Sequence, residues 1–339
     1  MRTAVVILNW NGKFFLETFL PVVIRYSRNV ADIVVADNNS TDGSVELLRE
    51  KFPEVKIVLN NSNLGFAGGY NEALKQVNAE YYVLLNSDIE VTENWISPVI
   101  ELMDKNREIA ACQPKILSYK QKDEFEYAGA AGGYIDKFGY PFCRGRIFTT
   151  LEKDLNQYDD EKEIFWVTGA CMFIRSEIFH RLGGFDSDFF AHMEEIDLCW
   201  RIHLSGSTTY YCPLSTVFHI GGGTLPKNNP RKTYLNFRNN LSMLYKNADR
   251  KKLPSILLFR TVFDFIAAFF FLFGSGWKDC KAVMKAHRDF HRTKGKLKRS
   301  DVRESGVNNL IYPKSILFSY FIFNRKKFSD LENFPVKKN

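Results

Sequence analysis

The sequence has few cysteines, and their spacing excludes two classes of protein. Six occur among 339 residues, and no two of them form a C-x-x-C pair. A disulfide framework or a small zinc site needs closely paired cysteines, so we expect reduced thiols in the core of a cytoplasmic protein. Residues 1–20 hold an apolar run broken by Asn9, Asn11 and Gly12, with no cleavage-site pattern. We therefore predict no signal peptide.

Long apolar runs and a strong net charge are also missing. Residues 253–277 are rich in Leu, Ile and Phe, but they are interrupted by Arg260 and Asp264, which can pair at their spacing of four residues. Nine uninterrupted apolar residues remain, 265–273. A bilayer span needs about 20. The net charge of +7, from 46 basic and 39 acidic residues, is too small to indicate a nucleic-acid partner.

A dinucleotide-binding fingerprint is absent as well. Gly65, Gly68 and Gly69 do not have the G-x-G-x-x-G spacing, and they follow the third predicted strand rather than the first. A nicotinamide or flavin enzyme is therefore disfavoured. Two interpretations of this glycine loop stay open, namely a tight turn into a helix and direct contact with a phosphate.

Short β-branched runs alternate with helical segments through the first 106 residues. Strands are predicted at 3–8, 33–36, 55–59 and 81–85, and each ends in a loop rich in Asn, Asp or Ser. This alternation is typical of a doubly wound α/β sheet, in which ligands bind at the carboxyl ends of the strands. Residues 128–145, rich in glycine and aromatic residues, are expected to be irregular.

Acidic residues and one histidine form the strongest candidate for chemistry. Asp88 follows a buried strand, Glu194 and Glu195 begin a predicted helix, and His219 ends a later strand. Carboxylate and imidazole ligands suit Mg²⁺ or Mn²⁺, and an ionised glutamate can accept a proton from a hydroxyl group. Asp197 and Arg201 lie four residues apart on this helix, and we expect them to pair with one another.

Six motifs in order carry a resemblance to a known family. They are V-V-I-L-N-W-N-G, V-V-A-D-N-N-S-T-D-G-S, N-x-N-L-G-F-A-G-G-Y-N, L-L-N-S-D, the stretch from G-A-C-M-F-I-R to E-E-I-D-L-C-W-R, and V-F-H-I-G-G-G-T. Together they resemble inverting family-2 glycosyltransferases over about residues 3–240. The rhamnosyltransferase-like enzymes of bacterial cell-surface polysaccharide assembly are the most similar subset.

This resemblance implies a GT-A fold, a nucleoside-diphosphate sugar donor and a single displacement at the anomeric carbon. Glu195 corresponds to the catalytic base, with Glu194 as the alternative. Asp88 and His219 correspond to ligands of Mg²⁺ or Mn²⁺. The donor site is assigned to six further residues, of which Asp37 or Asn38 would contact the nucleotide base: Asn9, Asp37, Asn38, Asn63, Gly65 and Asn86.

The sequence departs from the family pattern at two positions. Asn86 stands at the first position of the D-x-D-type motif, and Glu195 stands where Asp is usual. The first change is tolerated within the resembling subset. The second adds one methylene group of reach, which leaves the choice between Glu195 and Glu194 open.

The predicted catalytic domain spans residues 1–245, and residues 246–339 form a helical extension. We expect residues 253–277 to lie as an amphipathic helix at an anionic membrane surface, held by the basic run 278–299. A helix packed on the catalytic domain and a membrane span are the alternatives. Residues 316–323 repeat the apolar pattern before the basic residues 325–327, which favours a peripheral location at the inner face of the plasma membrane.

The sequence therefore predicts an inverting glycosyltransferase in cell-surface polysaccharide assembly. The sugar is possibly rhamnose, and the expected acceptor is a saccharide on a polyprenyl lipid. Asn86 and Glu195 also raise an alternative, a catalytically impaired, membrane-attached subunit with the same fold. A nucleotidyltransferase is disfavoured because it would need a basic glycine-rich loop near the N-terminus, where the chain has Asn9-Trp-Asn-Gly12.

Overall fold

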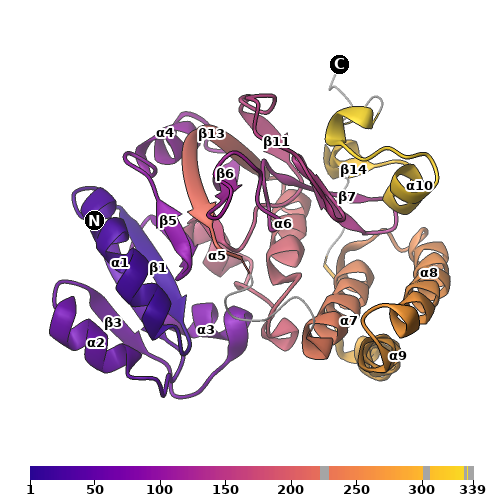
Figure 1. Ribbon diagram of the computed structural model, residues 1–339, viewed down its shortest axis with the longest axis horizontal. Helices are drawn as coiled ribbons and strands as arrows, with labels where there is room; N and C mark the ends of the chain where they lie inside the picture. The colour runs from indigo at the N-terminus through magenta and orange to yellow at the C-terminus, as the bar shows by residue number, and fades with distance from the viewer. Residues whose placement is uncertain (222–228, 301–305, 332–333, 335–339) are drawn as a thin grey trace.

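The first half of the chain builds the expected alternation of strands and helices. The computed structural model describes residues 1–221, 229–300, 306–331 and 334 (Figure 1). Strands β1, β2, β3 and β4 are parallel in the order β3-β2-β1-β4. The elements up to this point are β1 (Thr3–Asn9), α1 (Lys13–Ser27), β2 (Asp32–Asp37), α2 (Ser44–Lys51), β3 (Lys56–Leu59), α3 (Gly65–Leu74) and β4 (Tyr81–Asn86).

Beyond β4 the main sheet becomes mixed. Strand β12 pairs antiparallel with β4 and joins it to β6, which pairs parallel with β13. The path continues to β11, while the short β5 pairs with β13. The elements of this half are β5 (Ile89–Val91), α4 (Ser97–Lys105), β6 (Ile109–Ser118), β11 (Lys162–Ile164), β12 (Cys171–Arg175), α5 (Ser176–Arg181), η1 (Ser187–Phe189), α6 (Glu194–Leu204) and β13 (Thr208–His219).

Both faces of this sheet are buried, and alternate residues of its strands pack into the two hydrophobic cores on opposite sides. In β1, Ala4 and Val6 join a cluster with residues of α3 and α6, whereas Val5 and Ile7 join one with residues of α1, α2 and α4. A strand covered on both sides reads as a continuous apolar run. All six cysteines lie in the described part of the chain, are buried and have free thiols, as predicted.

A second, five-stranded sheet replaces the irregular structure expected for residues 128–145, so that expectation was wrong. Its strand order is β10-β9-β8-β7-β14, and the last strand comes from the C-terminal region. Short strands separated by glycine turns show no clear period of two, which explains the error. The strands are β7 (Gly133–Asp136), β8 (Pro141–Cys143), β9 (Arg146–Ile147), β10 (Thr150–Leu151) and β14 (Ile311–Tyr312).

Buried Asp136 helps to join the C-terminal region to this sheet. Its carboxylate accepts backbone N–H groups from Phe138, Tyr140 and Ile316 at 2.9 Å each. Tyr312 of β14 is also buried in the main core. The boundary between residues 245 and 246 stays a prediction, but the extension contributes a strand and core residues as well as helices.

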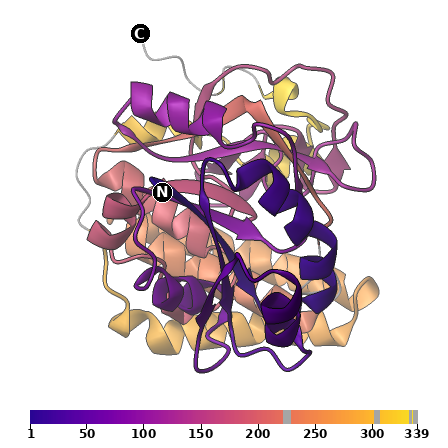
Figure 2. The same ribbon diagram turned by 90° about the vertical axis from the view of Figure 1, so that its left-hand side faces the viewer.

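Three long helices and a short one form most of the C-terminal region. Figure 1 shows α7, α8 and α9 side by side on the side of the molecule opposite α1 and α2, and Figure 2 shows them behind the main sheet. Residues 222–224, the end of the predicted histidine motif, lie outside the described residues. The elements are α7 (Pro230–Asn247), α8 (Leu253–Phe273), α9 (Trp277–Thr293), η2 (Lys294–Lys296), η3 (Gly306–Leu310), α10 (Ile316–Phe321) and η4 (Phe328–Asp330).

Helix α8 has one polar, buried side and one apolar, exposed side. Arg260 and Asp264 form the predicted pair at 3.2 Å, and Asp264 also accepts hydrogen bonds from Tyr140 at 3.0 Å and from His287 of α9 at 3.1 Å. Among the described helices, α8 alone is long and apolar enough to cross a membrane by length and composition. The buried ion pair instead fixes one side of α8 against protein.

Candidate active site

Loops at the carboxyl ends of β1, β2 and β4 meet in one polar cavity. Parallel pairing sets Asn9 beside Asp37 and Leu8 beside Asn86, so the three strands end at the same edge of the sheet. The cavity there has a volume of about 310 Å³. Eight of the ten predicted site residues line it: Asn38, Asn63, Gly65, Asn86, Asp88, Glu194, Glu195 and His219.

The other two predicted residues, Asn9 and Asp37, lie beneath the cavity and do not line it. Asn9 Nδ2 donates to Asp37 Oδ1 at 3.0 Å, and the second carboxylate oxygen of Asp37 accepts the backbone N–H of Ser40 at 2.8 Å. Both side chains are buried. They hold the loop that follows β2, and their contact with the donor stays a prediction.

Three asparagines join the loops that wall the cavity. Asn38 Nδ2 donates to Asn63 Oδ1 at 3.1 Å and to the carbonyl oxygen of Gly65 at 3.0 Å. Its Oδ1 accepts a hydrogen bond from Asn60 Nδ2 at 3.1 Å. Because both ends of the Asn38 amide are engaged, its position is fixed before any ligand binds.

The glycine loop is a tight turn rather than a phosphate cradle. The N–H groups of Phe66 and Ala67, at the start of α3, donate to the carbonyl oxygen of Phe190 at 2.6 and 3.2 Å. Gly65 has φ +72°, and a Cβ atom there would lie 2.4 Å from that same oxygen. A protein carbonyl therefore occupies the helix N-terminus, which resolves the two interpretations of this loop.

Asp88 and His219 come together through strand pairing. Antiparallel β5 and β13 place His219 opposite Ile89, the residue after Asp88. His219 Nε2 lies 3.2 Å from Asp88 Oδ1, and its Nδ1 lies 3.2 Å from Glu126 Oε2. Burial alone would lower the pKa of His219, but hydrogen bonds to the two carboxylates outweigh it and raise the pKa to about 10.

Glu126 is a buried residue of this group that no sequence motif marks. It lies between β6 and the glycine-rich residues 128–145, and its backbone N–H donates to Ile116 O at 3.1 Å, which brings it beside His219. A carboxylate on the far nitrogen of a ligating histidine orients the ring and makes it a stronger ligand.

The Asp88–His219 pair is suited to a divalent cation that also contacts the donor. The described residues contain no group of three or more His, Cys, Asp or Glu side chains arranged to hold a metal. Mg²⁺ and Mn²⁺ at phosphate sites commonly take one or two protein ligands and complete their shell with phosphate oxygens and water. Two adjacent ligands in a cavity wall fit that arrangement, provided that the cation displaces the proton that Asp88 and Glu126 favour on His219.

Glu194 and Glu195 face the cavity from the first turn of α6. Each has one side-chain oxygen, Oε2, with no hydrogen-bond partner among the residues that the structure describes. Burial raises the pKa of Glu195 to about 7, and burial together with the charge of Glu195 raises the pKa of Glu194 well above its usual value. Glu195 can therefore gain and lose a proton near neutral pH.

Asp197 points away from the cavity and forms the predicted pair. Arg201 Nε lies 2.9 Å from Asp197 Oδ2, and Lys246 of α7 contacts the same oxygen at 3.0 Å. Burial would raise the pKa of Asp197, but Arg201 and Lys246 lower it. Asp197 is thus a structural anion, and proton transfer is left to the two glutamates.

Two cations and a histidine in the cavity wall also escaped the sequence analysis. Arg231 and Lys232 open helix α7 and line the cavity, as does His192. Burial, with the charge of Lys232, lowers the pKa of His192 to about 4, so this ring is neutral at physiological pH. No local pattern marks Arg231 and Lys232, because they reach the cavity only through the packing of α7, and His192 lies in the turn before α6.

A sheet of this order, with a polar cavity at its strand ends and paired carboxyl groups facing a carboxylate–histidine pair, defines a GT-A sugar transferase. Residues 4–183 match the family model described as glycosyl transferase family 2. The chain belongs to this family.

Known relatives and solved structures agree with this assignment. The N-acetylglucosaminyl-diphospho-decaprenol L-rhamnosyltransferase of Mycobacterium tuberculosis is 25% identical over 222 residues, which cover 60% of this chain and 71% of the relative. Rhamnosyltransferase WbbL of Escherichia coli is 26% identical over 47% of this chain and 59% of its own. A crystal structure of GalNAc-T7 with UDP, GalNAc and Mn²⁺ superposes with a TM-score of 0.57 at 18% identity and covers 88% of this chain, which spans only 55% of GalNAc-T7.

The close approach of Gly65 to Phe190 predicts a measurable difference between two glycines. Gly65 and Gly183 have similar φ angles, +72° and +78°, but nothing lies within 4 Å of a Cβ atom at Gly183. Gly183→Ala should cost about 1–2 kcal/mol of unfolding free energy, the price of the left-handed conformation alone. Gly65→Ala should cost at least about 1 kcal/mol more, because the backbone contact must also move. Equal losses in urea denaturation would contradict the proposed contact.

Proposed function

We propose that this chain is an inverting glycosyltransferase that moves a sugar, with rhamnose as the candidate, from a nucleoside diphosphate to a saccharide on a polyprenyl lipid. One observation carries the proposal: Glu194 and Glu195 face the same 310 Å³ cavity as the Asp88–His219 pair. A carboxylate base and a site for a diphosphate-bound cation within one cavity are what this reaction requires.

The residues of the cavity divide the work of donor binding. Asn38 and Asn63 face the nucleotide, and Arg231 and Lys232 bring positive charge to the diphosphate. Asp88 and His219 would hold Mg²⁺ or Mn²⁺. When bound, such a cation would offset the negative charge of the departing diphosphate. The Mn²⁺ and UDP in the crystal structure of GalNAc-T7 support this assignment.

Glu195 acts as the base in a single displacement. Its ionised carboxylate takes the proton of the acceptor hydroxyl as the acceptor oxygen bonds to the anomeric carbon. The bond from that carbon to the diphosphate breaks, and the nucleoside diphosphate leaves. Gly169 lines the same cavity, and a Cβ atom there would lie 3.0 Å from the ring of Phe66.

Rhamnose and a lipid-linked acceptor are supported by the relatives. The mycobacterial enzyme is named for transfer of L-rhamnose to a diphospho-decaprenol saccharide, and WbbL is also a rhamnosyltransferase. The impaired-subunit alternative, prompted by Asn86 and Glu195, makes the opposite prediction about turnover.

The central test is release of nucleoside diphosphate from dTDP-, UDP- and GDP-sugars, with Mn²⁺ or Mg²⁺ and a membrane lipid extract as acceptor source. We expect metal-dependent release from one donor, lost in Asp88→Ala. Glu195→Gln should reduce kcat by about 10²–10⁴-fold, while the half-exposed control Glu72→Gln on α3, outside the cavity, should not. Full activity in Glu195→Gln, with loss in Glu194→Gln, would move the base to Glu194. Donor binding without release would favour the impaired subunit.

The raised pKa of Glu195 sets the expected pH dependence. Because burial raises this pKa to about 7, the base is protonated and inactive below pH 7 and ionised above it. At saturating substrates, kcat should fall about tenfold per pH unit below 7 and level off above it. A profile that stays flat from pH 5.5 to 7 would mean that a different group is the base.

We also propose that α8 and α10 bind an anionic membrane surface. Phe318 of α10 contacts Phe259 and Phe263 of α8 with ring centroids 6.1 and 5.3 Å apart, so the two segments form one surface. Its exposed apolar side chains are Leu258, Val262, Phe265, Ile266, Phe269, Phe270, Leu272, Phe273, Phe321, Ile322 and Phe323. An apolar surface of this size on a monomer usually marks an interaction site.

A basic stripe on the neighbouring helix favours lipid as the partner. Helix α9 packs against α8 and carries exposed cations at alternating spacings of three and four residues, which places them on one side of the helix: Lys278, Lys281, Lys285, Arg288 and Arg292. Cations beside an apolar surface suit the anionic headgroups above the acyl chains of a bilayer. Such a surface would bring the enzyme to its lipid-linked acceptor.

Vesicle sedimentation tests this surface. Binding should be stronger to vesicles with anionic lipid than to neutral ones. Lys281→Glu with Lys285→Glu should weaken it at least about tenfold, as should Phe269→Glu with Phe273→Glu. Leu214 is an equally exposed apolar residue on β13, and Leu214→Glu is the matched control. Equal binding by all four proteins would refute the membrane surface.

A further inference from the structure

The residues just before the two glutamates have an unusual backbone. Phe190, His192 and Met193 have φ angles of +64°, +71° and +72°, the left-handed region that residues other than glycine rarely adopt. Phe190, Ala191 and His192 also line the cavity. The turn formed by residues 189–193 therefore both shapes the cavity and sets the direction in which α6 begins.

Two elements, α3 and α7, hold this turn through its carbonyl oxygens. The start of α3 donates to Phe190 O, as described above. From α7, the side-chain amide of buried Asn239 donates hydrogen bonds from Nδ2 to Phe189 O at 2.9 Å, to Ala191 O at 2.9 Å and to His192 O at 2.7 Å. Three acceptors around one amide fix its orientation, because only the nitrogen can donate.

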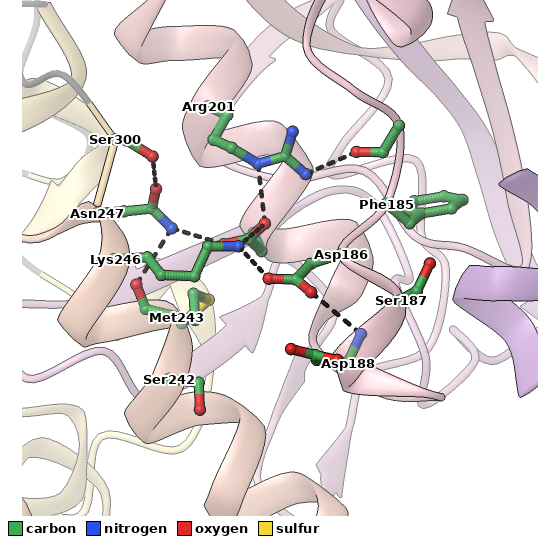
Figure 3. Close-up of polar contacts among 12 residues, drawn as sticks. Phe185, Asp186, Ser187, Asp188, Arg201, Ser242, Met243, Lys246, Asn247 and Ser300 are labelled. Atoms are coloured by element: carbon green, nitrogen blue, oxygen red, sulfur yellow. Dashed lines mark hydrogen bonds and ion pairs between the residues drawn. The ribbon is translucent and has the colours of Figure 1, made fainter. Parts of the chain in front are cut away.

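Neighbouring residues of α7 anchor the chain on both sides of the turn. Lys246 lies 2.7 Å from Asp186, which precedes the turn, and 3.0 Å from Asp197, which follows it. Asn247 Nδ2 donates to Asp197 Oδ1 at 2.8 Å. Figure 3 shows Lys246 reaching from α7 toward Asp186, with Asn247 beside it and Arg201 nearby on α6.

We infer that Asn239 is a positioning residue for the catalytic base. Alone among the described side chains, its amide donates to three carbonyl groups of the turn, and the turn ends at Met193, one residue before Glu194. Loss of this amide frees the left-handed residues to relax, and the start of α6 moves with them. The residues proposed to hold the cation and the nucleotide come from the loops after β2, β3 and β4 and from the end of β13, so Asn239 acts chiefly on the rate of transfer. This inference rests on the proposed function.

The test compares Asn239→Ala with Leu241→Ala in the full chain. Leu241 is a buried residue of the same helix, so its truncation lowers stability without removing a contact to the turn. Asn239→Ala should reduce kcat by about 10²-fold, the scale of a small displacement of a reacting group. Binding of UDP, dTDP and GDP with Mn²⁺, measured by calorimetry, should stay within about threefold of the wild type. Leu241→Ala should retain kcat.

Hydrogen exchange supplies a readout that does not need activity. Amides of residues 188–196 should exchange at least about tenfold faster in Asn239→Ala than in the wild type. Their exchange rates in Leu241→Ala should equal those of the wild type. If the wild type releases no nucleoside diphosphate from any donor, the proposed function fails. The role of Asn239 in holding the turn is then tested by hydrogen exchange alone. Asn239→Ser, which keeps one donor, replaces the alanine variant if the latter does not fold. Unchanged exchange, or equal losses of kcat in the Asn239 and Leu241 variants, would overturn the inference.

Discussion

The rest of the site depends on the turn of residues 189–193, whose carbonyl oxygens accept hydrogen bonds from α3 and α7. Three non-glycine residues there lie in the left-handed region, each at a cost of about 1–2 kcal/mol. Contacts from α3 and α7 offset that cost. Gly65 is required at one of these contacts because Phe190 O lies where its side chain would be. The glycine loop, the turn of residues 189–193 and the paired glutamates are thus linked through these contacts.

Electrostatics give the two sides of the cavity different properties. On one side His219 lies between Asp88 and Glu126, which together favour its charged form. On the other side burial raises the pKa values of Glu194 and Glu195. Asp197, only two residues further along α6, shows the contrast, because Arg201 and Lys246 lower its pKa. Position on the helix therefore decides which acid is structural and which can transfer a proton.

Much of this arrangement could be predicted from the sequence because it depends on local patterns. Strand runs that end in polar loops located the cavity, and spacing of four residues located the Asp197–Arg201 and Arg260–Asp264 pairs. Residues that reach the site through tertiary packing could not be predicted. Glu126, Arg231 and Lys232 carry no local signal, and the five-stranded sheet needs β14 from the far end of the chain. Asn9 and Asp37 belong to the right loops, but hydrogen bonding within the loop turns them away from the cavity.

The C-terminal region connects this chemistry with the place where it is expected to occur. Helix α7 lines the cavity at one end and anchors α6 along its length, while α8 packs its buried ion pair against protein and leaves an apolar side exposed. The same region therefore holds the helix that carries the proposed base and exposes the surface that we propose binds lipid.

The most direct test of the central claim is the anomeric configuration of the transferred sugar, determined by nuclear magnetic resonance of the product. A base that activates the acceptor hydroxyl, with a single displacement of the diphosphate, predicts a configuration opposite to that of the donor. Retention of the donor's configuration would contradict the account, because it would require a second displacement that the proposed base does not perform.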